Sequence, residues 1–315
     1  MRLTARRLNR TLLLRQHMST RTSRSAEDVA DHLLGLHAQD PLAPYLSLAA
    51  RRHEPRAELT EGWVRLATLR GATHLHTVEQ ARWFRPWLQP ALDKQCGGAP
   101  VDDLRAAVAE ALADGPLPKA ELTAELGGRL PSTPTDLVLR LAAPVVVLGD
   151  EVTHFEVGAP LAAEDVVRRF LAAYGPATAA DLAVWSSATG LGPTVRRMDD
   201  LVRFEAPDGR TLYDVPDGVL AEEDAPAPVR LLGAYDGLWL AHAARDRVTA
   251  PGSRDGWRGG TGAVRHTVFV DGWLTGTWRP VGGRVTDLAL SRGLTPAERE
   301  ELDEEVSVVE AMMAP

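Results

Sequence analysis

Hydrophobic and polar positions in the middle of the chain predict three short helices followed by two strands. Residues 101–115, "VDDLRAAVAEALADG", carry apolar side chains at helical spacing and end at a glycine. Residues 116–127 predict a second helix, with a proline near its first turn, and residues 132–142 predict a third. Residues 144–158, "PVVVLGDEVTHFEVG", predict a hairpin that turns near Gly149. This order is typical of a winged helix.

The same order follows at once in the next 60 residues. Helices are predicted over 163–175, which closes on a glycine, over 176–186, which opens on a proline, and over 192–201. Residues 202–215, "VRFEAPDGRTLYDV", predict a hairpin, and its Asp208-Gly209 dipeptide is a strong signal for a type I′ turn.

The N-terminal third fits this template more loosely. Residues 4–17, 25–37 and 62–71 are interpreted as helices, and residues 73–78, "THLHTV", as extended chain. We therefore expect a third unit of the same kind.

The pattern changes after residue 222. Residues 228–242 and 266–290 alternate apolar and polar positions between glycine turns, which predicts a small β-rich domain. Residues 295–314 predict a terminal acidic helix, with Thr295 as N-cap and Glu298 three residues later. The predicted fold class is α+β: three tandem winged-helix units at 1–97, 98–159 and 160–222, followed by a C-terminal β-rich domain at 223–315.

Length and composition place the chain among soluble globular proteins. Its 315 residues exceed one ordinary core. It has no apolar run of about 18 residues, which argues against a membrane span, and its arginine-rich start lacks the pattern of a secretion signal. We expect a cytoplasmic protein, associated with the nucleoid when it acts on DNA. Cys96 is the only cysteine, which excludes an internal disulfide and any multi-cysteine metal site.

Charge is distributed unevenly along the chain. The net charge is −8, which argues against indiscriminate attraction to a polyanion. Residues 294–315 hold seven acidic residues against Arg299. Residues 1–24 hold no acidic residue, and they form either a DNA-facing patch or an ordinary helix surface. Their seven basic residues are Arg2, Arg6, Arg7, Arg10, Arg15, Arg21 and Arg24.

Four segments of the chain carry a family resemblance. They are "LLGLHAQ" at 33–39, "YGPATAADLAVWS" at 174–186, "RLLGAYDGLWLAHAARDRV" at 230–248 and "VFVDGWLTGTWR" at 268–279. Together, and in this order, they resemble the signature segments of the AlkZ/YcaQ-type bacterial DNA glycosylases. The resemblance implies three tandem winged helices and a C-terminal β domain, cupped around double-stranded DNA. It also implies hydrolysis of the bond between deoxyribose and an alkylated purine, including N7-alkylguanine and, in some members, bulky adducts or crosslinks.

The catalytic motif of that family is Gln, an apolar residue and Gln, and this chain reads His37, Ala38, Gln39. The second Gln matches, and the first is replaced by His37. Alkylation at N7 makes guanine cationic, so the base leaves without a general acid. An amide such as Gln39 then has only to hold a water and face the positive sugar.

His37 is either a second catalytic group or a helix-end residue that binds a terminal carbonyl. As a neutral imidazole with a pKa near 6.5, it would accept a hydrogen bond from the water and act as a base. Activity should then fall as the pH drops through the pKa of His37. Asp40 next to the motif either faces the sugar or caps the turn before Pro41, and we favour the turn.

Further candidate residues lie outside the motif. The basic loop at 244–266 is expected to contact DNA, while Trp and Tyr in the signature segments are candidates for a damaged-base pocket, although such residues are more often core. The candidate DNA contacts are Arg245, Arg247, Arg254, Arg258 and Arg265, with Trp257 among them, and the candidate pocket residues are Asp40, Trp185, Tyr235, Asp236 and Trp239.

A metal site and a Schiff-base mechanism are both disfavoured. His74 and His76 share one face of a strand, but no third ligand accompanies them. Lys94 and Lys119, the only lysines, lie far from the motif in sequence, so a monofunctional hydrolase is expected rather than an enzyme that attacks through an amine.

We therefore expect a cofactor-free enzyme that acts on double-stranded DNA without an obligate protein partner. The alternatives are a non-catalytic tandem winged-helix DNA-binding protein, such as a transcriptional regulator, and a protein-interaction scaffold. The chain shows no heptad dimerisation helix, which weakens the regulator hypothesis.

Overall fold

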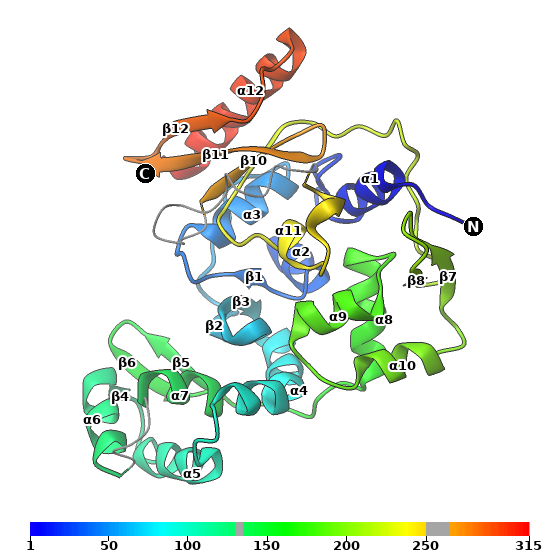
Figure 1. Cartoon of the computed structure of the whole chain (residues 1–315). Coiled ribbons are helices and arrows are strands. Elements are labelled where there is room, and N and C mark those ends of the chain that lie inside the picture. Colours follow the sequence, from blue (N-terminus) through cyan, green and yellow to red (C-terminus); the bar gives the residue numbers. More distant parts are fainter. Residues whose placement is uncertain (130–134, 250–264, 315) are drawn as a thin grey trace.

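The structure is a computed structural model that describes residues 1–129, 135–249 and 265–314 (Figure 1). Within these ranges the fold is mixed α/β, with four small sheets distributed among the helices. Among the residues described, no helix combines the length and the apolar character needed to cross a membrane.

The first 95 residues surround a three-stranded sheet of order β1-β3-β2. The strands are β1 (Leu36–His37), β2 (Trp63–Ala67) and β3 (Thr73–Thr77), and both pairings are antiparallel. The helices are α1 (Ala5–Arg15), α2 (Ala26–His32), α3 (Ala43–Arg51) and α4 (Val78–Gln95).

Two of the helix predictions for this region are wrong. Residues 62–71 form strand β2 and a 3-10 turn (Leu69–Gly71), because the "WVRLA" segment alternates partly exposed and buried positions against β3. The helix predicted over 25–37 ends at His32, because Leu34 and Gly35 both have positive φ, at 60° and 103°. His37 therefore lies on a strand, and the helix-end interpretation of this residue is wrong.

Residues 101–154 form a lobe at one end of the molecule, which packs on α4 and β2 through α7 and β5 (Figure 1). The element order is α5 (Val101–Ala111), β4 (Leu117–Pro118), α6 (Lys119–Arg129), α7 (Thr135–Ala142), β5 (Val145–Leu148) and β6 (Glu151–His154). The predicted hairpin around Gly149 is confirmed, and β4, which the sequence did not indicate, adds a third strand to it.

Residues 163–214 repeat the helices and the hairpin. The elements are α8 (Ala163–Tyr174), α9 (Ala179–Ser186), α10 (Leu191–Arg197), β7 (Val202–Glu205) and β8 (Thr211–Asp214). Gly175 caps α8 as predicted, whereas α9 begins after Thr178, whose side chain forms a capping box with Asp181. The β7–β8 turn is not type I′, because Gly209 has a positive φ of 84° and Asp208 does not.

The C-terminal region is a four-stranded antiparallel sheet of order β12-β11-β10-β9 with a terminal helix against it. Residues 228–242 contribute only a three-residue strand and then a short helix, so the strand pattern predicted there is largely wrong. The capping box of Thr295 and Glu298 is confirmed. The elements are β9 (Arg230–Leu232), α11 (Gly237–Leu240), a 3-10 turn (Arg245–Arg247), β10 (His266–Val270), β11 (Trp273–Val281), β12 (Arg284–Leu290) and α12 (Pro296–Met313).

One buried apolar cluster joins these regions. It extends from Leu12 on α1 through α4 to α10 and reaches Leu274 on β11. The boundaries expected at residues 97, 159 and 222 therefore pass through a shared core, although they remain predictions.

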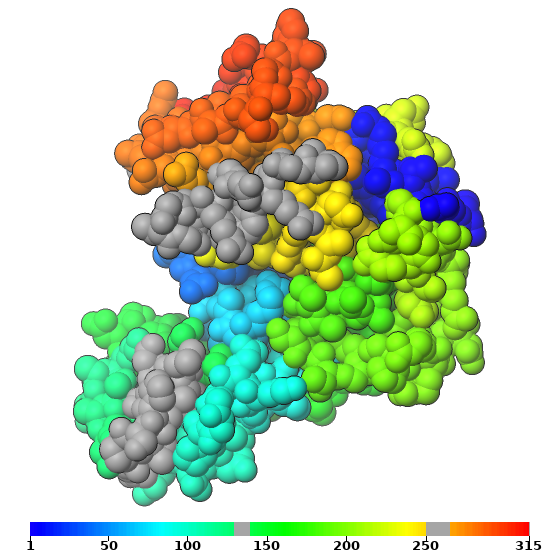
Figure 2. Space-filling view, in the orientation of Figure 1, coloured from blue at the N-terminus to red at the C-terminus, as the bar shows by residue number. Residues whose placement is uncertain are grey.

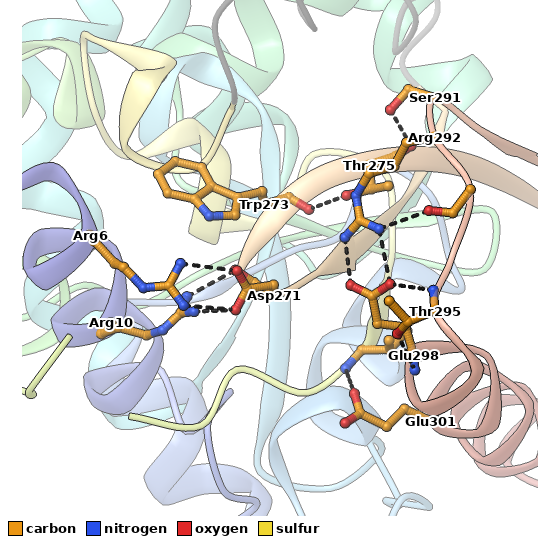
Figure 3. Close-up of polar contacts among 12 residues, drawn as sticks. Arg6, Arg10, Asp271, Trp273, Thr275, Ser291, Arg292, Thr295, Glu298 and Glu301 are labelled. Carbon is orange, nitrogen blue, oxygen red and sulfur yellow. Dashed lines mark hydrogen bonds and ion pairs between the residues drawn. The ribbon is translucent and has the colours of Figure 1, made fainter. Parts of the chain in front are cut away.

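Most arginines at the start of the chain pair with acidic residues far along it. Arg15 binds Asp214 through two hydrogen bonds of 2.7 and 2.8 Å, and both side chains are buried. Arg6 and Arg10 both bind Asp271 (Figure 3). These ion pairs attach α1 to later elements of the chain. A structural role therefore accounts for these arginines better than a DNA-facing patch does.

Candidate functional site

His37 lies at the end of β1, where three aromatic rings meet. Its ring stacks on Tyr235, with centroids 4.8 Å apart and an interplanar angle of 28°, and meets His74 edge-on at 5.4 Å. The pairing of β1 with β3 places His37 directly opposite His74. The side chain of His37 is buried, with 8% of its surface exposed.

His37 lines a small cavity between the N-terminal sheet, α9 and α11. The cavity has a volume of about 20 Å³, which is room for a single water. The cavity can therefore hold the nucleophile of a hydrolysis but not a purine base. The other lining residues are Gly35, Leu69, Arg70, His74, Tyr174, Trp185, Tyr235, Gly237, Leu240 and Ala241.

The surroundings of His37 keep its imidazole neutral. Burial, and then the charge of Arg70, lower its pKa to about 4, against the opposing effects of Asp236 and Asp40. Its Nδ1 is buried and receives no hydrogen bond from the residues described. The fall in activity expected near pH 6.5 is therefore displaced to about pH 4.

Gln39 and Asp40 form a bend between β1 and α3. Gln39 is exposed, two residues after the buried His37. Asp40 Oδ1 accepts a hydrogen bond from the Leu42 backbone N–H at 2.9 Å, and Asp40 Oδ2 lies 3.5 Å from His266 Nε2. These contacts fit the turn-capping role that we favoured for Asp40.

Tyr235 is held against His37 by an unusual backbone and a buried ion pair. Its φ is +65°, a conformation that non-glycine residues rarely adopt. The next residue, Asp236, binds Arg51 through hydrogen bonds of 2.7 and 2.9 Å and caps α11 by accepting from the Leu238 N–H. Burial raises the pKa of Asp236, but Arg51 and these hydrogen bonds outweigh it, and the net pKa is lowered. Asp236 thus supports Tyr235 and does not line the cavity.

The two candidate tryptophans have different surroundings. Trp185 lines the cavity, and its backbone carbonyl accepts a 2.7 Å hydrogen bond from Arg70. Trp239 is buried in the core, with the Arg245 guanidinium 5.8 Å from its ring centroid. Of the candidate pocket residues, the cavity brings together Trp185 and Tyr235.

Comparison with known proteins identifies the family. The model of the AlkZ-like DNA glycosylases matches residues 30–312. The chain belongs to the AlkZ-like DNA glycosylase family. An interstrand DNA cross-link repair glycosylase from Streptomyces sahachiroi is 28% identical over 323 residues, which covers 85% of each chain. The structure of the Streptomyces sahachiroi DNA glycosylase AlkZ superposes with a TM-score of 0.78 at 22% identity, covering 99% of this chain and 97% of that one.

This AlkZ-like chain is therefore an enzyme, a hydrolase that acts on N-glycosidic bonds of DNA. The family resemblance of the four sequence segments is confirmed, and the regulator and scaffold alternatives are not supported.

The candidate DNA contacts of this AlkZ-like protein are only partly described. Arg265 is exposed just before β10. Arg245 and Arg247 turn inward, because each donates a 2.6 Å hydrogen bond to a backbone carbonyl, that of Trp239 and that of Pro176. Arg254, Trp257 and Arg258 lie outside the described residues.

His74 and His76 have structural partners rather than a metal-site arrangement. His74 Nδ1 donates to the Ala72 carbonyl, and His76 lies between Thr68 and Gln80, at 3.0 and 2.6 Å. Among the residues that the structure describes, no group of three or more metal-ligating side chains is found.

Sequence reasoning missed two cavity residues, Arg70 and Tyr174. Arg70 has a φ of +56° in the turn between β2 and β3, and its pKa is lowered to about 10 by burial. Tyr174 donates to the Leu33 carbonyl at 2.8 Å. Tyr174 lies in a signature segment, which was the available signal, whereas Arg70 lies in the segment mistaken for a helix.

Proposed function

We propose that the chain is a monofunctional DNA glycosylase that removes cationic N-alkylpurines, of the N7-alkylguanine type, from duplex DNA. The observation that carries the proposal is an exposed Gln39 at the family motif, two residues from a His37 cavity with room for one water. Three tandem winged-helix units, at the boundaries given above, would hold the duplex.

Hydrolysis of the glycosidic bond of a cationic purine requires few catalytic groups from the protein. A purine alkylated at N7 is already positive, so it departs neutral once the glycosidic bond breaks, and no general acid is required. A positive sugar remains, which must be stabilised and attacked by water. The Gln39 Oε1 accepts a hydrogen bond from that water and directs its partial negative charge at the sugar.

His37 assists as a neutral acceptor rather than as a strong base. With a pKa of about 4 it removes a proton poorly at neutral pH, since an effective general base has a pKa near the working pH. A neutral imidazole still accepts a hydrogen bond from water, and it does not repel the positive sugar as an imidazolium would.

A lysine nucleophile has no place in this arrangement. Lys94 on α4 and Lys119 at the start of α6 are exposed, and neither lines the His37 cavity. The product would therefore be an intact abasic strand.

The substrate range extends in this proposal to bulky adducts and interstrand crosslinks. The Streptomyces sahachiroi relative is an interstrand DNA cross-link repair glycosylase. An open site suits such substrates, because the His37 cavity is too small to enclose even one base. Arg265 would contact the phosphates, as would Arg254 and Arg258, which lie beyond the described residues. Arg245 and Arg247 would support the start of the basic loop at 244–266.

The decisive experiment uses a duplex that carries one N7-methylguanine, with abasic sites revealed by alkali. We expect excision by the wild type and a loss of about 100-fold or more for Gln39→Ala, in line with the removal of one group that positions the reacting centre. Gln95→Ala, which changes another exposed glutamine at the end of α4, is the matched control and should keep full activity. Equal activity of the two variants would contradict the proposal.

A further inference from the structure

A second and larger cleft lies between α1, the β7–β8 hairpin and the β10–β11 turn. Its volume is about 270 Å³, close to the lower end of the range of small-molecule sites. Most of its wall is apolar. Figure 2 shows the start of the chain, in blue, beside the residues near 205–215, in yellow-green. The lining residues that carry the argument are Ala5, Leu8, Leu212, His242, Arg247 and Trp273.

Trp273 is fixed at the cleft by the turn that precedes it. Asp271 and Gly272, with φ of 49° and 76°, form a two-residue connection between the paired Val270 and Trp273. The carboxylate of Asp271 binds Arg6 and Arg10 of α1 (Figure 3). The two arginines therefore hold the turn that carries Trp273, and a planar ligand in the cleft would meet the indole ring.

Two side chains at the floor of the cleft offer hydrogen bonds to a ligand: His242 as an acceptor and Arg247 as a donor. His242 is 3% exposed, and its Nε2 donates to the Tyr174 carbonyl at 2.9 Å, so its Nδ1 carries a lone pair. No described residue donates to that Nδ1. Burial and then Arg247 lower the pKa of His242 to about 3, so the lone pair persists at neutral pH.

Arg247 supplies the donors. Its Nη1 donates to the Pro176 carbonyl at 2.6 Å, and within the described residues no group accepts from its Nε or Nη2. Its charge is balanced by Asp181 and Asp246 nearby. A ligand here need not be an anion.

A purine base has the edge that this floor requires. Adenine presents an N–H donor next to a ring-nitrogen acceptor, and guanine an N–H donor next to a carbonyl oxygen. The donor would reach His242 Nδ1, the acceptor would receive from Arg247, and the ring would stack on Trp273. We propose that this Trp273 cleft is a binding site for a purine base, either free or as an unstacked nucleotide of a DNA strand.

The cleft is distinct from the His37 cavity. The two share no lining residue, although they lie on either side of the adjacent residues Ala241 and His242. The inference therefore does not depend on the catalytic roles of Gln39 and His37, and its failure would leave the proposed function intact.

Calorimetric titration of the full chain tests the site with two matched ligands, 9-methyladenine and 9-methylpurine, which differ only in the exocyclic amino group. We expect 9-methyladenine to bind and 9-methylpurine to bind about tenfold more weakly, because His242 then has no donor. Free N7-methylguanine and a short oligodeoxyadenylate distinguish a free base from a strand nucleotide, and binding of either supports the site if the cleft variants remove it.

Two variants locate the binding. Trp273→Ala should weaken it about tenfold through lost stacking, and Trp87→Ala on α4 is the control at another half-buried tryptophan. Ala5→Trp at the exposed start of α1 should fill the cleft and abolish purine binding while excision persists. No binding of any purine at millimolar concentration, or binding unchanged in Ala5→Trp, would overturn the proposal.

Discussion

Removal of the Asp236 carboxylate should destabilise the protein more than any loss of a surface ion pair. Asp236 and Arg51 expose 2% and 1% of their side chains, and two short hydrogen bonds join them. Asp236→Ala leaves the Arg51 charge buried without its partner, which costs about 3–5 kcal/mol. The lost cap of α11 adds about 1 kcal/mol. We expect a total of about 4–6 kcal/mol.

Urea unfolding followed by circular dichroism measures this effect. With a slope of about 1–3 kcal/mol per molar urea, the midpoint of the transition that includes α11 should fall by roughly 1.3–6 M. Because a chain of this size need not unfold in one step, hydrogen exchange at α11 should accompany the measurement. At urea concentrations below the unfolding midpoint, the excision rate of Asp236→Ala should also be lower than that of the wild type, since Tyr235 loses its support against His37.

Two controls separate the buried charge from general damage. Asp200→Ala breaks a solvent-exposed pair with Arg168 and should leave the unfolding midpoint nearly unchanged. The double variant Arg51→Met with Asp236→Leu removes both charges and should recover much of the loss. An Asp236→Ala variant as stable as Asp200→Ala would refute the reasoning.

Three further predictions concern the pH dependence of stability, the substitution of two glycines and the salt dependence of DNA binding. Burial lowers the pKa of His37 and His76 to about 4, below the unfolded value of 6.5, so the unfolded state binds more protons between those values. Stability should therefore be complete above pH 6.5 and fall toward pH 4, by about 3 kcal/mol for each buried histidine, and a thermal midpoint constant from pH 7 to 4.5 would contradict this. Gly35→Ala should cost about 2–4 kcal/mol in urea unfolding, because a Cβ would lie 2.3 Å from His76 Cε1 at a φ of +103°, whereas Gly62→Ala, with φ of +80° in open space, should cost only about 1 kcal/mol. Arg265→Ala should reduce the slope of log affinity for duplex DNA against log salt by about one, and an unchanged slope would exclude a phosphate contact.

Two Asp-Gly dipeptides show what local sequence can and cannot predict. Asp208-Gly209 was expected to form a type I′ turn, but the loop between Glu205 and Thr211 is longer, and only its glycine has positive φ. Asp271-Gly272 does form the two-residue turn with both φ positive. The dipeptide permits the turn, but the register of the flanking strands selects it.

The residues of the functional site also fall into those that local sequence could predict and those that it could not. Gln39 and His37 could be found from the family motif, because they are contiguous in sequence. The neighbours of His37 in the cavity could not, since Tyr235 and Arg70 come from segments about 200 and 30 residues away and both have positive φ angles that the sequence does not indicate. Helices α8, α9 and α12 were predictable because their caps are local, whereas the β2 segment was mistaken for a helix because five residues are too few to separate the two periodicities.

The attachment of α1 to later parts of the chain bears on how the protein is made. The ion-pair partner of Arg15 lies 199 residues downstream, and that of Arg10 lies 261 residues downstream. At about 5–20 residues per second, a nascent α1 emerges on the order of 10–50 s before those carboxylates are synthesised. Its arginines and its apolar face are then open to chaperones or to the polyanionic ribosome surface. Docking of the first helix through these ion pairs is therefore among the last events of biosynthesis, although its residues are the first translated.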